Sequence, residues 1–335
     1  MPLKAWLAER LGEPEDVMAL RDVPSPTPAD GEVLLRVRAV SLGFPDVLIV
    51  RGEYQTRHEL PFSPGSEVCG EVGGERVAAV AVGGTGALAQ YLVADPRYVY
   101  PAPTSLSDAE TAALPAAFMT AWFGLHERGR LQPGETVVVT AAAGGVGSAA
   151  VQLGRAAGAR VIGITRGSAK TARIRELGAH VVIDSTAEDV VARVREETEG
   201  GGADVVFDVV GGDAYHAASR YVGCGGRILV VGFASGEVQS ARLNRPLLGG
   251  FSIVGVNMSL HLRHEPDAVR EAMSAIAKLC DAGTVKPFVG VTVGMADAAH
   301  QLQRIGAGLT SGRVAVDPWQ VAVDPWRQAA PQLRE

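Results

Sequence analysis

Lysine, cysteine and long apolar stretches are all scarce in this 335-residue sequence. There are only four lysines, and 31 basic residues against 37 acidic ones give a formal net charge of −6, so nothing favours nucleic acid or an anionic membrane as a partner. Cys69, Cys224 and Cys280 are too widely spaced for a disulfide framework or a four-thiolate metal site. No apolar run reaches the roughly 18–20 residues of a membrane span, and no signal segment opens the chain. We therefore expect a soluble cytoplasmic protein with neither kind of partner.

A strand, a glycine turn and a helix follow one another over residues 136–157. The β-branched run 137–140 predicts a buried parallel strand, and an alanine-rich helix follows the glycines. Gly144, Gly145 and Gly147 let the backbone turn sharply and approach a pyrophosphate, whose charge sits on the free N–H groups of a helix start. A tight turn between two buried elements would use glycines too. With this context on both sides, the pattern indicates dinucleotide binding.

The predicted elements divide the chain into a β-rich first part and an α/β second part. The first part contains a long irregular connection over 41–65, which we expect to be functional because such loops in compact domains usually are. From residue 107 onward, strands alternate with helices, which predicts a parallel sheet covered on both faces. Its predicted strands are 136–140, 160–165, 180–184, 204–209, 226–231 and 251–256. The end repeats one hexapeptide at 314–319 and 321–326; we expect the first copy to close a strand and the second to lie in an exposed tail.

The end of the second predicted strand bears on cofactor choice. NAD-binding versions of such a fold place an acidic residue about 20 positions past the glycines, where it holds the ribose hydroxyls. Here Thr165 and Arg166 end the strand and Lys170 follows, without a carboxylate at that point. Cationic donors suit a 2′-phosphate, which Arg166 could bind bidentately. The sequence favours NADPH over NADH, although a surface helix that is basic at its start would look the same.

Together these features resemble a zinc-independent medium-chain dehydrogenase/reductase of the NADPH:quinone oxidoreductase (zeta-crystallin-like) group. The resemblance covers nearly the whole chain and is carried by the segments 43–46, 60–67, 120–122, 141–147, 177–179 and 252–256 together with Lys170. It implies an α/β fold with two domains. A GroES-like β-rich catalytic domain spans 1–119 and is completed by 258–335, and a Rossmann domain with a doubly wound parallel sheet spans 120–257. It further implies a homodimer formed through the apolar edge strand 251–256, which would otherwise be exposed.

The same resemblance implies chemistry without a metal. Zinc-dependent relatives place a histidine before the glutamate of a Gly-His-Glu segment and a cysteine near position 41. This chain has Ser66 before Glu67, and Ser41; the cysteine cluster of the structural zinc is also missing. Hydride would then come from NADPH, helped by hydrogen-bond donors of the protein rather than by a Lewis acid.

The resemblance also places candidate residues around the cofactor. Tyr54 and Asp46 are the catalytic candidates, with Tyr54 as donor to the oxygen on which negative charge develops; a tyrosine that packs a loop and an aspartate that starts a helix are the ordinary alternatives. Thr120 could bind the carboxamide or cap a helix. The expected cofactor contacts are Gly43, Phe44, Thr120, Ala143, Gly144, Gly145, Val146, Gly147, Thr165, Arg166, Lys170, Val210, Gly232, Phe233 and Ala234.

Two departures from the family pattern leave the substrate open. Gly43 stands where the family usually has asparagine, and Leu48 where it often has tyrosine. We expect a small-molecule acceptor, namely a quinone or an α,β-unsaturated carbonyl. An enoyl thioester, such as an acyl-CoA, is the alternative substrate. The non-enzymatic alternative is a structural protein of this family that binds the cofactor without turnover.

Overall fold

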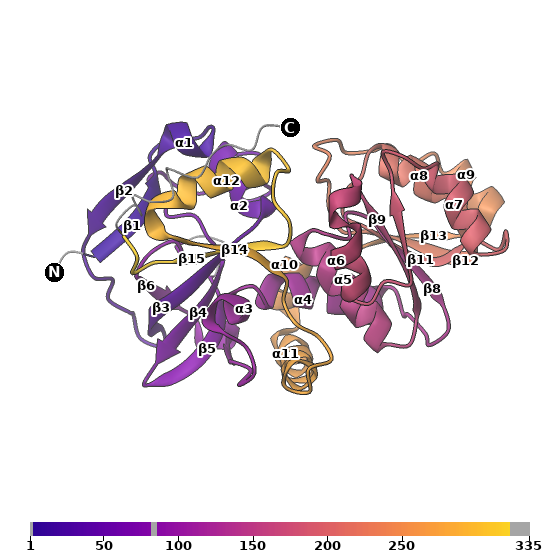
Figure 1. The fold of residues 1–335 in the computed structure, drawn as a ribbon. Coiled ribbons are helices and arrows are strands. Elements are labelled where there is room, and N and C mark those ends of the chain that lie inside the picture. The colour runs from indigo at the N-terminus through magenta and orange to yellow at the C-terminus, as the bar shows by residue number, and fades with distance from the viewer. Residues whose placement is uncertain (1–2, 82–85, 322–335) are drawn as a thin grey trace. The chain divides into compact units, whose positions relative to one another are not determined.

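The computed structural model describes residues 3–81 and 86–321, which include the first copy of the repeated hexapeptide but almost none of the second. These residues form two compact units. Of the described residues, unit 1 comprises 3–81, 86–99, 291–309 and 314–321, and unit 2 comprises 100–290 and 310–313. The division at 119/120 and 257/258 that the sequence suggests stays a prediction. The α/β class is confirmed, since one part contains an antiparallel sheet and the other a doubly wound parallel sheet with helices (Figure 1).

Unit 1 is built on antiparallel strands. In the seven-stranded sheet the order is β14-β15-β3-β4-β5-β7, and β6 also pairs with β3. In β3, Leu35 and Val37 are fully buried while Arg36 and Arg38 are exposed, as expected for a strand with one face on a core. The strand bounds are β1 Leu3–Ala8, β2 Met18–Val23, β3 Val33–Leu42, β4 Glu67–Val72, β5 Glu75–Val80, β6 Tyr91–Ala94, β7 Val99–Pro101, β14 Val289–Gly294 and β15 Arg313–Asp317.

The connection predicted as irregular over 41–65 contains a helix, so that part of the prediction is wrong. Helix α2 spans Phe44–Arg51, with Pro45 in its first turn and Gly52 as a left-handed C-cap at φ 74°. Proline fits the first turn, where its missing N–H costs nothing, and glycine fits the left-handed end of a helix. The residues that suggested a loop are therefore the start and stop signals of a helix. The other helices of unit 1 are α1 Pro14–Val17 and α12 Ala298–Gly306.

Unit 2 contains a six-stranded parallel sheet in the order β10-β9-β8-β11-β12-β13. The chain runs outward from β8 to β10 and then returns to β11 beside β8, so β8 and β11 meet where the strand order reverses. In open α/β sheets, ligands bind beyond the carboxyl ends of the strands at this point. The six predicted strands are confirmed as β8 Thr136–Val139, β9 Arg160–Thr165, β10 Val181–Asp184, β11 Ala203–Asp208, β12 Val222–Val230 and β13 Ser252–Gly255.

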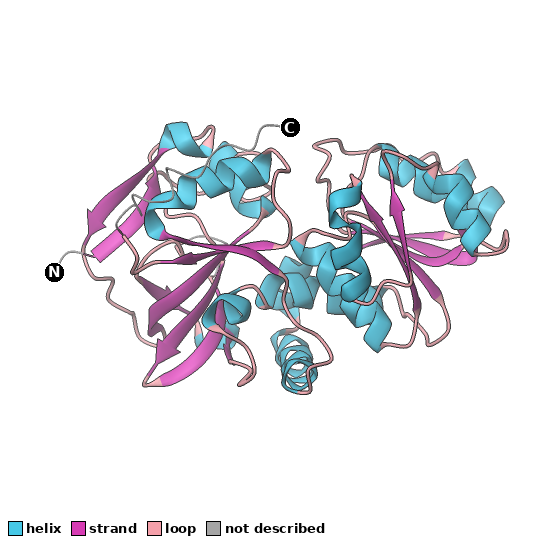
Figure 2. Ribbon diagram, in the orientation of Figure 1, coloured by secondary structure: helices cyan, strands magenta, loops and turns pink. Residues whose placement is uncertain are grey.

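Helices cover both faces of this sheet (Figure 2). Valines on β8 and β11 are fully buried, because a parallel strand between two helix layers has no solvent face. The helices of unit 2 are α3 Asp108–Ala112, α4 Pro115–Trp122, α5 Gly145–Ala156, α6 Thr171–Glu176, α7 Val190–Glu197, α8 Asp213–Tyr221, α9 Asn244–Gly249, α10 Met258–His264 and α11 Pro266–Asp281. Within the described ranges, none of the helices combines the length and the apolar character that a membrane span needs.

Candidate cofactor and catalytic site

The glycine turn lies at the carboxyl end of β8 and starts helix α5. The N–H of Gly144 donates to the carbonyl of Ala141 at 2.9 Å, which closes the turn. A Cβ on Gly147 would lie 2.3 Å from the same carbonyl oxygen, so the backbone leaves no room for a side chain there. The first N–H groups of a helix have no acceptor within it. The turn therefore offers close backbone approach and free donors, which fits the diphosphate of a dinucleotide.

Residues 310–313 support this turn from a distant part of the chain. The N–H of Gly312 donates to the carbonyl of Ala143 at 2.8 Å, and Gly312 also forms a parallel bridge with Gly144. The Arg313 side chain lies against Gly145, since a Cβ there would be 2.4 Å from its Cδ. Lys170 Nζ donates to the carbonyl of Thr310 at 3.0 Å. The segment 310–313 therefore contacts both the glycine turn and the residues that follow β9.

Thr165 and Arg166 lie at the carboxyl end of β9. Thr165 is buried and Arg166 is exposed. Among the described residues, Arg166 has neither a carboxylate partner nor a hydrogen bond from its guanidinium, whereas Lys170 is held by a carbonyl. Arg166 is therefore the available cation at the position where sequence predicts the 2′-phosphate.

Asp184, at the end of the neighbouring strand β10, is a carboxylate that the sequence reasoning missed. Its Oδ1 accepts hydrogen bonds from the backbone N–H of Thr186 at 3.0 Å, the Thr186 hydroxyl at 2.7 Å and the N–H of Gly167 at 2.9 Å. These donors, Thr186 first, hold the pKa of Asp184 below its usual range. The carboxylate thus fixes the loop that follows Arg166. The position of Asp184 at the end of an apolar predicted strand is the feature of the sequence that could have revealed it.

The carboxyl ends of β11 and β12 meet at a second turn. Asp208 is almost fully buried; its Oδ1 accepts from the Thr140 hydroxyl at 2.8 Å and from the N–H of Val210 at 3.0 Å. The N–H of Ala234 donates to Val209 at 3.1 Å. The structure therefore brings the predicted contacts Val210, Gly232, Phe233 and Ala234 together. Thr140 and Asp208, which organise them, were missed.

Thr120 lies within α4, six residues after the N-cap Leu114. The alternative that Thr120 caps a helix start is therefore wrong. The helix continues as a π-helical turn over Phe123–Arg128, a geometry that is frequent at functional sites. Thr120 is half-buried, and α4 packs against α5, the helix that begins at the glycine turn.

In unit 1 the candidates surround helix α2. Gly43 is its extended N-cap and Phe44 its first residue, and buried Asp46 accepts the N–H of Gly43 on Oδ2 at 2.7 Å. A carboxylate in a first helical turn stabilises the helix, so Asp46 holds this turn in place.

Tyr54 follows α2 and packs against the core of unit 1. Burial, and then the negative charge of Asp46, raise the pKa of its phenol. The hydroxyl makes no hydrogen bond to another described residue. The Tyr54 phenol therefore keeps its proton at neutral pH, and its role as a donor stays a prediction.

The candidate residues divide between the units. Unit 1 holds Gly43, Phe44, Asp46 and Tyr54, and unit 2 holds the others; the structure brings each set together within its own unit. Across the described residues, no group of three or more His, Cys, Asp or Glu side chains is arranged to hold a metal ion.

Comparisons with known proteins bear on the family and the fold of the chain. Residues 145–278 match the family described as zinc-binding dehydrogenase, and residues 29–104 match the alcohol dehydrogenase GroES-like domain. The chain is 34% identical over 333 residues to a quinone oxidoreductase-like protein 2 homolog of Nematostella vectensis, covering 95% of this chain and 89% of that one.

Two further relatives bear on activity. The solved quinone oxidoreductase of Thermus thermophilus, whose structures include a complex with NADPH, is 34% identical; the match has a TM-score of 0.81 and covers 94% of this chain and 99% of the other. A mycocerosic acid synthase-like polyketide synthase of Mycobacterium tuberculosis is 30% identical over 299 residues, which are 87% of this chain but only 14% of that protein.

Proposed function

The chain belongs to the quinone oxidoreductase-like medium-chain dehydrogenases/reductases, and on that basis we propose that it reduces quinones or α,β-unsaturated carbonyls with NADPH and without a metal. The observation that carries this proposal is the glycine turn beside an unpaired Arg166. Gly147 permits close approach of a diphosphate, and Arg166 is free to bind a 2′-phosphate. NADPH would supply the hydride.

The protein's own part in the reaction is to bind, orient and donate a proton. Tyr54 would donate to the acceptor oxygen as negative charge develops there. Asp46 would hold the first turn of α2, the helix that precedes Tyr54, by accepting the N–H of Gly43. Ser41 and Ser66 stand at the positions where the resemblance places zinc ligands in metal-dependent relatives. A serine hydroxyl is not among the usual zinc ligands, which are thiolate, imidazole and carboxylate.

Steady-state assays test the activity. We expect the full chain to oxidise NADPH with 1,4-benzoquinone or with a simple enone. Turnover of crotonyl-CoA but not of benzoquinone would instead assign the enoyl-thioester reaction, which the similarity to a polyketide synthase favours. Tight binding of NADPH without its oxidation by benzoquinone, the enone or crotonyl-CoA would contradict both activities. It would leave a non-catalytic role.

Removing the Tyr54 hydroxyl should lower turnover without loosening the cofactor. We expect Tyr54→Phe to reduce kcat/KM for the quinone by about tenfold to a hundredfold and to leave the Kd of NADPH unchanged. Tyr98→Phe removes a hydroxyl elsewhere in unit 1 and serves as the control. Wild-type kcat/KM in Tyr54→Phe would rule out the donor role.

The pH profile provides a second readout of Tyr54. Because its pKa is raised, the phenol keeps its proton above the ordinary tyrosine pKa of about 10. The rate that depends on Tyr54 should therefore persist to about pH 10 and fall only above it. Asp46→Asn removes one of the two causes that raise the pKa of Tyr54. The decline of the rate at high pH should therefore begin at a lower pH in this variant.

We also propose that the protein is a homodimer formed through β13. This strand is the last in its sheet and pairs only with β12 among the described residues. Leu243 and Leu247, just before it in the chain, are 76% and 80% exposed, and such apolar surface commonly marks an interface. Sedimentation should give twice the chain mass. A monomer mass across the accessible concentration range would contradict the proposal.

A further inference from the structure

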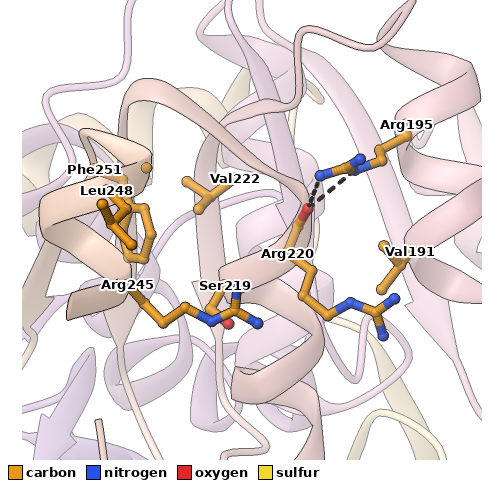
Figure 3. A pocket seen from close by; sticks show the side chains of 9 residues that line it. Val191, Arg195, Ser219, Arg220, Val222, Arg245, Leu248 and Phe251 are labelled. Atoms are coloured by element: carbon orange, nitrogen blue, oxygen red, sulfur yellow. Dashed lines mark hydrogen bonds between the residues drawn. The ribbon is translucent and has the colours of Figure 1, made fainter. Parts of the chain in front are cut away.

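A pocket of about 400 Å³ lies in unit 2, and none of the candidate cofactor residues lines it; Figure 3 shows its lining side chains. It is lined by residues of α7, α8 and α9, by Val222 at the start of β12 and by Phe251 just before β13. The cofactor candidates of unit 2 gather at the carboxyl ends of the strands, whereas Val222 and Phe251 mark the amino ends. The pocket is therefore a separate site on the same unit.

Three arginines line this pocket: Arg195, Arg220 and Arg245. None of them pairs with a carboxylate in the part of the chain that the structure describes. The glutamates at the end of α7 are engaged elsewhere, since Arg193 contacts Glu196 at 2.7 Å and Glu197 at 2.6 Å. The pocket thus carries uncompensated positive charge on a protein whose net charge is −6.

Helix stability explains only two of these arginines. Arg195 and Arg220 lie in the last turns of α7 and α8, where a cation complements the helix dipole. Arg195 also donates from Nε and Nη2 to the carbonyl of Arg220 at 3.0 and 2.7 Å, which fixes its guanidinium at the pocket (Figure 3). Arg245 lies in the first turn of α9, where the dipole disfavours a cation. Its position needs another reason.

Besides the arginines, Ser219 and Gly249, the pocket is lined by the apolar side chains of Val191, Val222, Leu248 and Phe251. Phe251 and Val191 are buried beside the arginines, and Leu248 at the rim is 80% exposed. A leucine so exposed gains nothing from the protein around it. The combination of cations and apolar surface suits a ligand with an anionic group at one end and an apolar body at the other.

We propose that this arginine pocket, formed by Arg195, Arg220 and Arg245 with Leu248 and Phe251, binds an organic phosphate monoester. A phosphate monoester carries nearly two negative charges at neutral pH, and guanidinium forks match phosphate oxygens. The volume lies in the range of small-molecule sites. The apolar part of the ester packs on Phe251 and Leu248.

Calorimetric titration of phenyl phosphate into the full chain saturated with NADPH tests whether the arginines bind the phosphate group. Saturation with NADPH excludes competition at the cofactor site, and the titration is repeated without NADPH so that the result does not depend on the proposed activity. We expect R220Q/R245Q to raise the Kd at least about tenfold. R242Q, three residues before Arg245 and not among the lining residues, should change it less than about twofold. An unchanged Kd in the double variant, or no binding to the wild type, overturns the proposal.

A matched pair of leucines tests whether Leu248 contacts the apolar part of the ester. Leu247 and Leu248 are equally exposed on α9, but only Leu248 lines the pocket. Leu248→Ser should weaken phenyl phosphate by about threefold to tenfold and leave inorganic phosphate unaffected, whereas Leu247→Ser should affect neither. Equal effects of the two substitutions would contradict an apolar contact at Leu248.

Two sources could supply the phosphate monoester, and a vesicle experiment separates them. A soluble ester predicts no sedimentation of the protein with phosphatidylcholine vesicles that contain phosphatidic acid. A lipid headgroup predicts sedimentation that R220Q/R245Q abolishes and R242Q does not. Sedimentation that is the same in both variants would overturn the role of the pocket at a lipid surface.

Discussion

Gly147→Ala is expected to raise the Kd of NADPH by about tenfold to a hundredfold. The added Cβ would lie 2.3 Å from the carbonyl oxygen of Ala141 and 3.0 Å from the Cα of Ala142, so the backbone of the turn has to move. Overpacking of this kind costs about 1–3 kcal/mol, and each 1.4 kcal/mol is a factor of about ten in affinity. Fluorescence titration of NADPH measures the change.

Two other glycines provide matched controls for Gly147. A Cβ at Gly145 would meet the Cδ of Arg313 at 2.4 Å, which is a side-chain atom rather than the backbone of the turn itself, so Gly145→Ala should weaken NADPH less than Gly147→Ala does. A Cβ at Gly255 meets nothing within 4 Å, and Gly255→Ala should bind NADPH normally. Circular dichroism verifies that all three variants are folded. Equal Kd values for the three would contradict a diphosphate seated on the turn.

Arg166→Ala is expected to change cofactor preference. Hydrogen bonds to a charged group contribute about 1.5–3 kcal/mol, so losing the guanidinium should raise the Kd of NADPH by about tenfold to a hundredfold. NADH lacks the 2′-phosphate, and its Kd should change less than about threefold. The ratio of the two dissociation constants, measured at one salt concentration because the contact is electrostatic, is the quantity to follow.

Arg175→Ala is the matched control for Arg166→Ala. Arg175 is an exposed arginine on α6, and its loss removes the same charge from the surface without touching the end of β9. Lys170→Ala differs from both, since Lys170 Nζ is held by the carbonyl of Thr310; it should loosen the support of the turn and weaken both cofactors. Equal losses for NADPH and NADH in Arg166→Ala would rule out the 2′-phosphate contact.

The Rossmann sheet was predictable because its signals are local. Short β-branched runs separated by helical segments occur in the sequence at the spacing that a parallel sheet requires, and the runs that form the central strands β8, β9 and β11 are buried as expected. Helix α2 was not predicted, because Pro45 and Gly52 have two meanings. Proline and glycine punctuate loops, yet they also begin and end helices, and only the backbone around Asp46 distinguishes the two cases.

The candidate site was predictable where one segment acts alone and was missed where distant segments meet. The glycine turn and Arg166 each lie in a recognisable stretch. The bond from Thr140 to Asp208 joins residues 68 positions apart, and no local pattern reveals such a pair. Asp184 was missed for a related reason: its role depends on lying beside β9, which pairing within the sheet decides.

The support of the glycine turn by residues 310–313 limits how this protein can be dissected. A fragment that ends at residue 290 contains every strand of the parallel sheet but lacks Gly312 and Arg313. Its glycine turn would lose the hydrogen bond to Ala143 and the side chain that covers Gly145. An excised nucleotide-binding module therefore has to carry this short segment with it, for example as a grafted loop, before it can serve as an independent building block.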